Sequence, residues 1–193
     1  SGLPLLAVDE RDPARTTTRG TGELLAAAVA QGARRILLTI GGSATVDGGV
    51  GAAAALGWRF LGADGRDVPP GGGHLGKIAR IVPPAPGRLP PVTVLCDVTN
   101  PLCGPDGAAA VFGPQKGATP RQVAQLDEGL RHLAGRIAAD VGRDVLALPG
   151  GGAAGGLGAG AAAFFDAVLT PGIDAVIDAC GLRQALRKAA WCI

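Results

Sequence analysis

The stretch RRILLTIGGSATVDGGVGAAAALG, residues 34–57, decides the fold class of this chain. Its first part, residues 34–40, has the apolar and β-branched density of a buried strand. A loop of glycines, hydroxyls and one carboxylate follows, and a helix is expected to begin near Gly49. Before the strand, residues 24–30 predict a short helix with Thr21 as its cap and Gly32 as its stop. A helix followed by a buried strand indicates an α/β fold.

The loop after that strand carries the groups that an anion site requires. Gly41 and Gly42 leave the backbone open to a ligand. Ser43 and Thr45 supply hydroxyls, and Asp47 supplies a carboxylate. This combination suits an oxyanion together with its metal or with sugar-like hydroxyls. A second interpretation stays open, in which Ser43 or Asp47 caps the next helix and the glycines only form turns.

Two further extended segments follow along the chain. Residues 57–68 carry an Asp-Gly turn between two short extended pieces, which predicts a hairpin. Residues 91–98, PVTVLCDV, predict a second strand. We therefore expect Asp97 at the carboxyl end of that strand, where ligand-binding residues are common.

The clearest helix signal follows Thr119. Thr119 and Gln122 make a capping box, Pro120 takes the first helical position, and Gly142 ends the helix. His132 lies off the apolar face, which predicts a solvated surface histidine. That face comprises Val123, Leu126, Leu130, Leu133, Ile137 and Val141. Later, another helix is expected after Thr170, with Thr170 as cap and Pro171 at the first helical position.

Other loops supply further candidate residues. Asp97 and Asn100 lie just beyond a strand, where they could bind a metal or a hydroxyl, although Asx turns explain such residues equally well. Lys116, between Pro114 and Gly117, is a candidate phosphate-binding cation or an ordinary solvated lysine. Gln115 beside it is a candidate binding residue. We expect the catalytic groups among Asp47, Asp97 and Lys116, with Mg²⁺ on Asp47 or Asp97.

Several glycine patterns are weaker. GGGHLGKI, residues 71–78, nearly matches a phosphate-binding loop, but Ile78 replaces the required hydroxyl and no strand precedes it. GVGAAA at residues 49–54 and GAGAAA at residues 158–163 resemble part of a dinucleotide fingerprint. Neither has a clear acidic partner after a second strand, so a dinucleotide-dependent oxidoreductase is only a distant alternative.

Composition excludes other classes of protein. The formal net charge of +2 comes from interspersed charges, and few aromatic residues are available for base stacking, so we expect no nucleic-acid partner. No apolar run is long enough for a bilayer, and no targeting segment is visible. The scattered cysteines Cys96, Cys103, Cys180 and Cys192 predict reduced thiols and a cytoplasmic protein.

Taken together, the motifs resemble one family, the bacterial type I glycerate kinases, which include glycerate 2-kinases. The resemblance lies in the amino-acid sequences of several stretches and in their order along the chain, and it covers residues 1–182. These stretches are TTTRGTGELL at 16–25, IGGSATVDGGVGAAAALGWRFL at 40–61, CDVTNPLCGPDGAAAVFGPQKGAT at 96–119 and GGGAAGGLGAGAAAFF at 150–165, with PGID after them.

The resemblance implies ATP- and Mg²⁺-dependent phosphorylation of D-glycerate to 2-phosphoglycerate by an enzyme of two α/β domains. This chain would be the second, inserted domain, a three-layer α/β structure with a mixed sheet, and would lack the first domain. Residues 183–193 are expected to be a divergent or truncated tail. Apolar surface meant for the first domain would favour a homodimer or aggregation. The alternative is a module that binds glycerate or phosphate without turnover.

Overall fold

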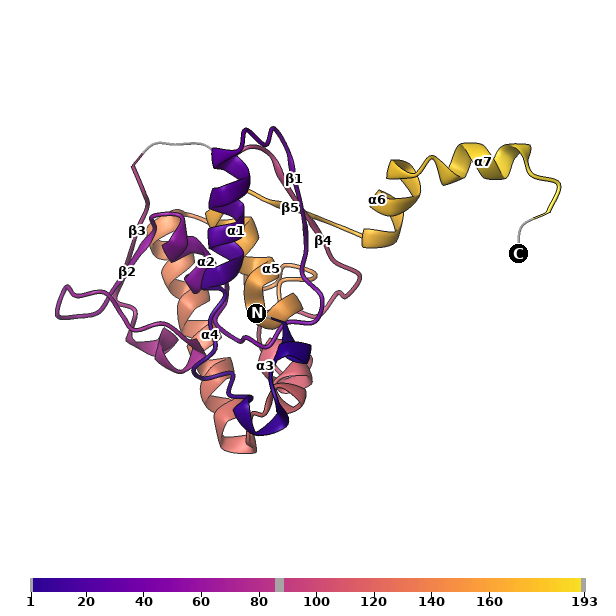
Figure 1. The fold of residues 1–193 in the computed structure, drawn as a ribbon. Coiled ribbons are helices and arrows are strands. Elements are labelled where there is room, and N and C mark those ends of the chain that lie inside the picture. The colour runs from indigo at the N-terminus through magenta and orange to yellow at the C-terminus, as the bar shows by residue number, and fades with distance from the viewer. Residues whose placement is uncertain (1, 86–88, 192–193) are drawn as a thin grey trace.

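The predicted strand within residues 34–40 is β1 (Ile36–Thr39), the first strand of a parallel sheet. In the computed structural model, which describes residues 2–85 and 89–191, β1 pairs with β4 (Val92–Leu95). β4 in turn pairs with β5 (Val168–Thr170), so that the strand order is β1-β4-β5. Parallel neighbours require long crossovers, and these crossovers carry most helices of the body, the exception being the helix that precedes β1 (Figure 1).

A second, separate sheet pairs β2 (Arg59–Leu61) with β3 (Arg80–Val82) in antiparallel fashion. The structure thus confirms an α/β fold with both parallel and antiparallel strands, and it distributes them over two sheets. The predicted hairpin around the Asp-Gly turn forms as a short one, with an antiparallel bridge from Leu61 to Asp67 and backbone hydrogen bonds from Gly62 to Arg66 and from Val68 to Phe60. The sequence did not predict the other neighbour of β2, which is β3, and there the opposed Phe60 and Ile81 both enter the core.

The helices near the loop largely follow the prediction. The first, α1 (Arg19–Ala30), begins earlier than expected, and Thr18 rather than Thr21 occupies its N-cap. The next, α2 (Val50–Ala55), starts directly after Gly49 as predicted. Then η3 (Gly72–Lys77), α3 (Ala108–Phe112) and η4 (Pro114–Lys116) form short turns.

The long helix α4 (Pro120–Val141) confirms the strongest local signal. Thr119 and Gln122 form the reciprocal capping box, and Gly142 ends the helix in a left-handed conformation. Its buried face includes Leu126, Leu130, Leu133 and Ile137. His132 is exposed, as expected, but its Nε2 lies 2.6 Å from the carbonyl oxygen of Ile78, so the ring also ties α4 to η3.

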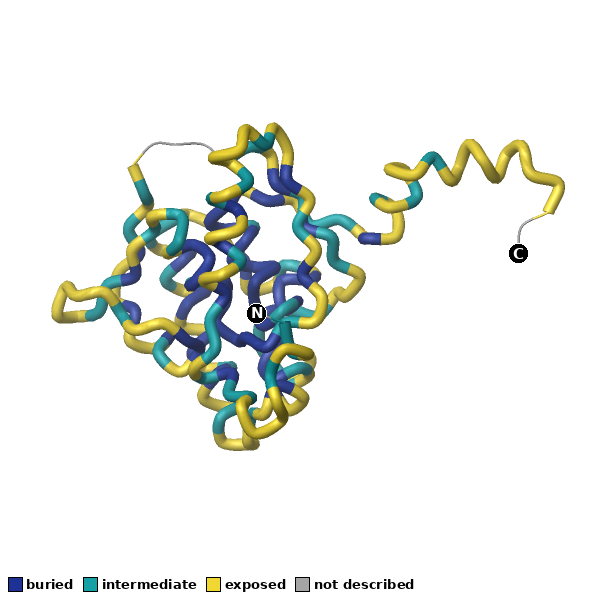
Figure 2. Tube along the Cα trace, viewed as in Figure 1, coloured by how far each residue is buried: buried dark blue, intermediate teal, exposed yellow. Residues whose placement is uncertain are grey.

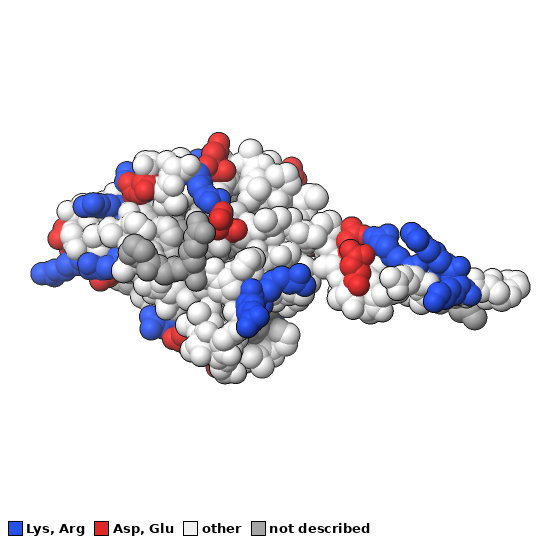
Figure 3. Space-filling model, turned by 90° about the horizontal axis from the view of Figure 1, so that it is seen from above, with Lys and Arg blue, Asp and Glu red and all other residues white. Residues whose placement is uncertain are grey.

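The core is concentrated around α5 (Ala153–Phe164), which contacts α2, α3, α4 and β5. Figure 2 shows the buried chain gathered in this body, whereas the last two helices are largely exposed. These are α6 (Gly172–Ala179), with Pro171 at its N-cap instead of inside the helix, and α7 (Leu182–Lys188). They extend from the body as an arm, which carries charged side chains of both signs among uncharged ones (Figure 3). No helix in the described residues has the length and apolar character needed to span a bilayer.

The cysteines carry no cross-link within the described residues. Cys96, Cys103 and Cys180 are free thiols, and Cys192 lies outside the described residues. Burial, and secondarily the nearby Asp127, raises the pKa of Cys103 to about 11. A thiol with so high a pKa is a poor nucleophile at neutral pH.

Candidate functional site

A small pocket of about 150 Å³ lies at the carboxyl end of β1, and we call it the β1 pocket. Four of the predicted binding residues line it, namely Gly41, Gly42, Ser43 and Thr45. Further hydroxyl-bearing residues line it from α1 and β1, and Leu157 of α5 adds an apolar wall. The carboxyl end of a parallel strand is where α/β proteins commonly place ligands. The structure therefore brings together most of the loop that the sequence singled out.

Thr45 gives this pocket an unusual buried group. Its side chain is 2% exposed, and its hydroxyl Oγ1 has no hydrogen-bond partner among the described residues. An unpaired buried hydroxyl costs about 1–3 kcal/mol.

Lys116 lies directly behind the loop. It ends η4, is 2% exposed, and its Nζ donates to Ser43 Oγ at 2.7 Å and to the Thr45 carbonyl oxygen at 2.8 Å. Burial lowers the pKa of Lys116 from 10.5 to about 8, while the negative charge of Asp47 acts in the opposite direction. At pH 7 the ammonium therefore keeps its proton, and a positive charge lies next to the loop.

Protonation of Lys116 should make the stability of the protein depend on pH. Between pH 8 and 10.5 the unfolded chain holds this proton and the native chain does not, so stability rises with pH. Relative to Lys116→Met, the wild-type free energy of unfolding should increase by about 3 kcal/mol across this window. Urea unfolding at pH 7.5 and 10 measures the difference. Lys77→Met, which removes an exposed lysine, is the matched control, and an equal rise against that variant would contradict the assignment to Lys116.

Asp47 is committed to the protein backbone. It is 1% exposed, and its Oδ2 accepts hydrogen bonds from the Thr18 amide at 2.8 Å, from the Thr18 hydroxyl at 2.9 Å and from the Thr17 hydroxyl at 3.2 Å. The amides of Gly49 and Gly51 also donate to it, each at 3.2 Å. The carboxylate thus joins the start of α1 to the start of α2. Of the two interpretations that the sequence left open, this geometry is that of a helix cap.

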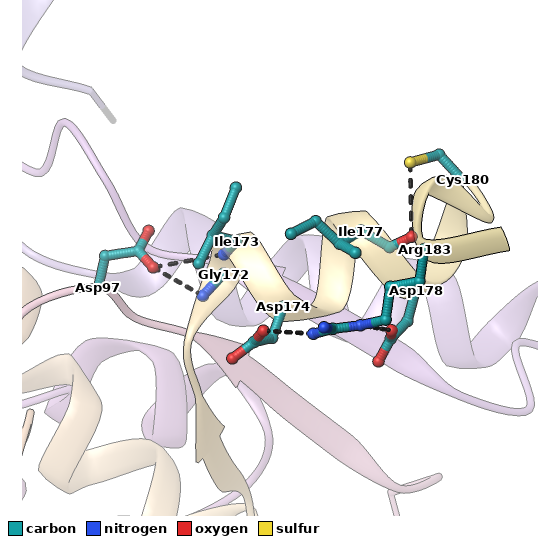
Figure 4. A network of polar contacts seen from close by, with 8 residues as sticks. All are labelled: Asp97, Gly172, Ile173, Asp174, Ile177, Asp178, Cys180 and Arg183. Atoms are coloured by element: carbon teal, nitrogen blue, oxygen red, sulfur yellow. Dashed lines mark hydrogen bonds and ion pairs between the residues drawn. The ribbon is translucent and has the colours of Figure 1, made fainter. Parts of the chain in front are cut away.

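Asp97 lies away from the β1 pocket, at the root of the arm (Figure 4). Its Oδ1 accepts hydrogen bonds from the amides of Gly172 at 2.8 Å and Ile173 at 3.4 Å, which are the first residues of α6. Farther along the arm, Arg183 bridges Asp174 and Asp178. Asp97 therefore satisfies the first amides of α6 from outside the helix, and it does not line the β1 pocket with Ser43 and Thr45.

The other two candidates also lie outside the pocket. The Asn100 side-chain amide donates to the Asp106 carbonyl oxygen at 2.8 Å, which closes the loop after β4. Gln115 is exposed, and its backbone oxygen accepts from the Arg11 side chain at 3.3 Å. Among the described residues, no three His, Cys, Asp or Glu side chains gather as a metal-binding group. We derive no step through Mg²⁺.

The sequence analysis did not identify the threonines in α1 and in the segment just before it as site residues. Thr18 and Thr21 line the β1 pocket together with Thr39, the last residue of β1. Thr16 donates to the Ala44 carbonyl oxygen at 2.7 Å, so the run TTT at residues 16–18 fastens the loop from the other side. A run of three threonines before a helix was the available signal. Only the fold shows which loop these hydroxyls face.

The remaining glycine patterns are packing elements. GVGAAA begins at the start of α2 after a loop, and GAGAAA lies inside α5, so neither forms a turn from strand to helix. The GGGHLGKI segment contains η3, whose buried Gly72 and Leu75 face α4. None of the three segments forms the phosphate-binding loop that its sequence motif suggests.

Comparison with known proteins identifies the relatives of this chain. The model of the glycerate kinase family matches residues 1–193. The chain is 47% identical to a glycerate kinase of Halalkalibacterium halodurans over 196 residues, which is all of this chain and 52% of that protein. It is 46% identical to the glycerate 2-kinase of Escherichia coli, again over the whole chain and 51% of that protein.

A solved structure agrees with these relatives. The crystal structure of a protein named glycerate kinase 2 from Salmonella typhimurium LT2 superposes with a TM-score of 0.92 at 48% identity, over 98% of this chain and 51% of that one. The chain spans about half the length of the curated relatives that it matches. By the family match over its full length, the chain belongs to the glycerate kinase family.

Proposed function

We propose that this chain supplies half of an enzyme that transfers a phosphoryl group from ATP to D-glycerate and forms 2-phosphoglycerate. The observation that carries the proposal is the β1 pocket, where the buried Lys116 ammonium donates to the Ser43 hydroxyl and to the Thr45 carbonyl oxygen. Phosphoryl transfer depends on positioning and on neutralising charge more than on covalent chemistry. A small pocket with hydroxyl donors and a nearby cation suits the carboxylate of a hydroxy acid.

The length of the chain relative to the kinases suggests how substrate binding would be shared between the two halves of the enzyme. The chain matches about half of each kinase, so the nucleotide would bind across its boundary with the other half of the enzyme. Mg²⁺ would then be held mainly by the ATP phosphates, as is usual for this ion. We further propose that the enzyme acts in the cytoplasm, and that the chain on its own could associate with a second copy through exposed apolar side chains of the arm, such as Ile173 and Val176.

A second candidate is a module that binds the anion without turnover. The observation that favours it is the same half-length coverage, because a lone half provides one wall of a cleft between two domains. Dinucleotide-dependent oxidoreduction has no comparable support, since both glycine patterns lie within packing elements.

Calorimetric titration of the chain with D-glycerate, with glycerol as the control that lacks a carboxylate, tests the pocket. We expect binding of D-glycerate alone, and no binding of NAD. A chimera in which this chain replaces the matching half of the Escherichia coli glycerate 2-kinase tests turnover, with release of ADP and the identity of the phosphoglycerate as readouts. A folded chimera that releases no ADP, beside a chain that binds D-glycerate, would favour the module. Failure of both measurements would reject the proposed function.

A further inference from the structure

The hydroxyl of Ser43 stands between Lys116 and the β1 pocket. Its Oγ accepts a hydrogen bond from Lys116 Nζ at 2.7 Å, and Ser43 itself lines the pocket. A serine hydroxyl has one hydrogen to donate and two lone pairs that accept. Because the ammonium occupies a lone pair, the hydroxyl hydrogen must turn elsewhere. Within the described part of the chain, no hydrogen bond uses that hydrogen.

The same ammonium also fixes the loop backbone beside Ser43. Lys116 Nζ donates to the Thr45 carbonyl oxygen at 2.8 Å. Ser43 and Thr45 line the β1 pocket, whereas Lys116 does not. The cation therefore lies behind the Ser43 hydroxyl, on the side away from the pocket.

We propose that Lys116 is a positioning residue, which orients the Ser43 hydroxyl so that it donates to the carboxylate of a small hydroxy acid in the β1 pocket, and which holds the Thr45 backbone beside it. The proposal rests on the proposed function for its ligand, and it gives Lys116 a different place from that of a phosphate-binding cation. Lys116 acts through Ser43 and the Thr45 backbone, without touching the ligand.

The arrangement has two physical advantages for binding an anion. Hydroxyls that are already oriented lose little rotational freedom when the ligand arrives, so more of the hydrogen-bond energy appears as affinity. The buried positive charge also polarises the Ser43 O–H toward the pocket, which strengthens its bond to a carboxylate. Both effects require the ammonium and the Ser43 oxygen together, and neither survives the loss of one partner.

A double-mutant cycle distinguishes a Lys116 that acts through Ser43 from a Lys116 that contacts the ligand directly. Titration calorimetry at pH 7 would measure the D-glycerate affinity of wild type, Ser43→Ala, Lys116→Met and the double variant. Ser43→Ala should weaken binding about tenfold or more, because it removes a hydrogen bond to a charged group. Lys116→Met should weaken binding at least as much. The double variant should bind like Lys116→Met alone, since the two residues act as one unit.

Thr39 provides the matched control for coupling. It also lines the β1 pocket, but no hydrogen bond in the described residues connects it to Lys116. The effects of Thr39→Val and Lys116→Met on affinity should therefore multiply. If the effects of Ser43→Ala and Lys116→Met also multiply, or if Lys116→Met binds D-glycerate as wild type does, the positioning role is wrong.

A measurement on the unaltered lysine guards against a Lys116→Met variant that does not fold. Lysines occur only at positions 77, 116 and 188, so lysine side-chain NMR can follow Lys116 individually. D-glycerate should shift the Lys116 side-chain signals of the wild type and leave those of Ser43→Ala nearly unchanged. Equal shifts in the two proteins would show direct contact and overturn the proposal.

Inorganic phosphate as a second probe separates this inference from the proposed function. Binding of phosphate with the predicted Ser43–Lys116 coupling, but no binding of D-glycerate, would reject the proposed substrate and retain the positioning of the Ser43 hydroxyl. D-glycerate binding without coupling would reject only the positioning role. A wild-type chain that binds neither anion would reject both.

Discussion

Gly155→Ala is expected to lower the free energy of unfolding by about 3 kcal/mol or more. Gly155 has a φ of +70° within a left-handed turn at the start of α5. A Cβ at this position would lie 1.9 Å from the Thr45 carbonyl oxygen and 2.7 Å from Val46 Cα. These are backbone atoms of the loop that carries the site, so relief of the clash must move that loop.

Gly142→Ala is the matched control for this substitution. Gly142 also has a left-handed φ, +74°, but an added Cβ would meet nothing within 4 Å. Both variants have the cost of about 1–2 kcal/mol for placing alanine in a left-handed conformation. Only Gly155→Ala adds the cost of the clash between the new Cβ and the backbone of Thr45 and Val46. Urea unfolding followed by circular dichroism measures both. Equal losses in the two variants would show that the backbone contact between α5 and Thr45 contributes nothing.

Asp47→Ala should be comparably severe, with an expected loss of about 3–5 kcal/mol. The substitution removes the acceptor for the amides of Thr18, Gly49 and Gly51, and for two threonine hydroxyls. Each buried donor left without a partner costs about 1–3 kcal/mol, although partial relaxation reduces the sum. Asp47→Asn keeps the shape and one acceptor oxygen, and should lose less than Asp47→Ala.

Asp144→Ala is the control for Asp47. Asp144 is exposed and accepts one hydrogen bond within the described residues, from the Leu146 amide, so its loss should cost less than about 1 kcal/mol. Urea unfolding at pH 7 compares the variants. An Asp47→Ala protein as stable as Asp144→Ala would contradict the structural role of this carboxylate and return Asp47 to the candidates for catalysis.

The local parts of the fold could be predicted from the sequence. The capping box of α4 involves Thr119 and Gln122, only three residues apart, and its apolar face repeats at helical spacing. The strand β1 also follows from a short run of apolar residues. In each case the interacting groups lie close together in the chain, so their order alone carries the information.

Contacts between distant residues explain what the sequence left open. The pairing of β2 with β3 depends on Phe60 and Ile81 meeting in the core, 21 positions apart, which the nearby Asp-Gly turn does not encode. Asp97 follows β4, as the sequence predicts, but its contact with the Gly172 amide of α6, 75 residues later, comes only from the fold.

The sequence by itself determined the α/β class, the helix of residues 120–141 and the glycine-hydroxyl loop of residues 40–45, because periodicity, caps and turn residues act over short distances. Only the tertiary structure decided what the loop faces. It buries Lys116 against Ser43 and Thr45, across 73 and 71 positions of sequence, and turns Asp47 toward Thr18. Buried polar groups must find partners wherever the folded chain places them, and those partners are set by packing rather than by neighbours in the sequence.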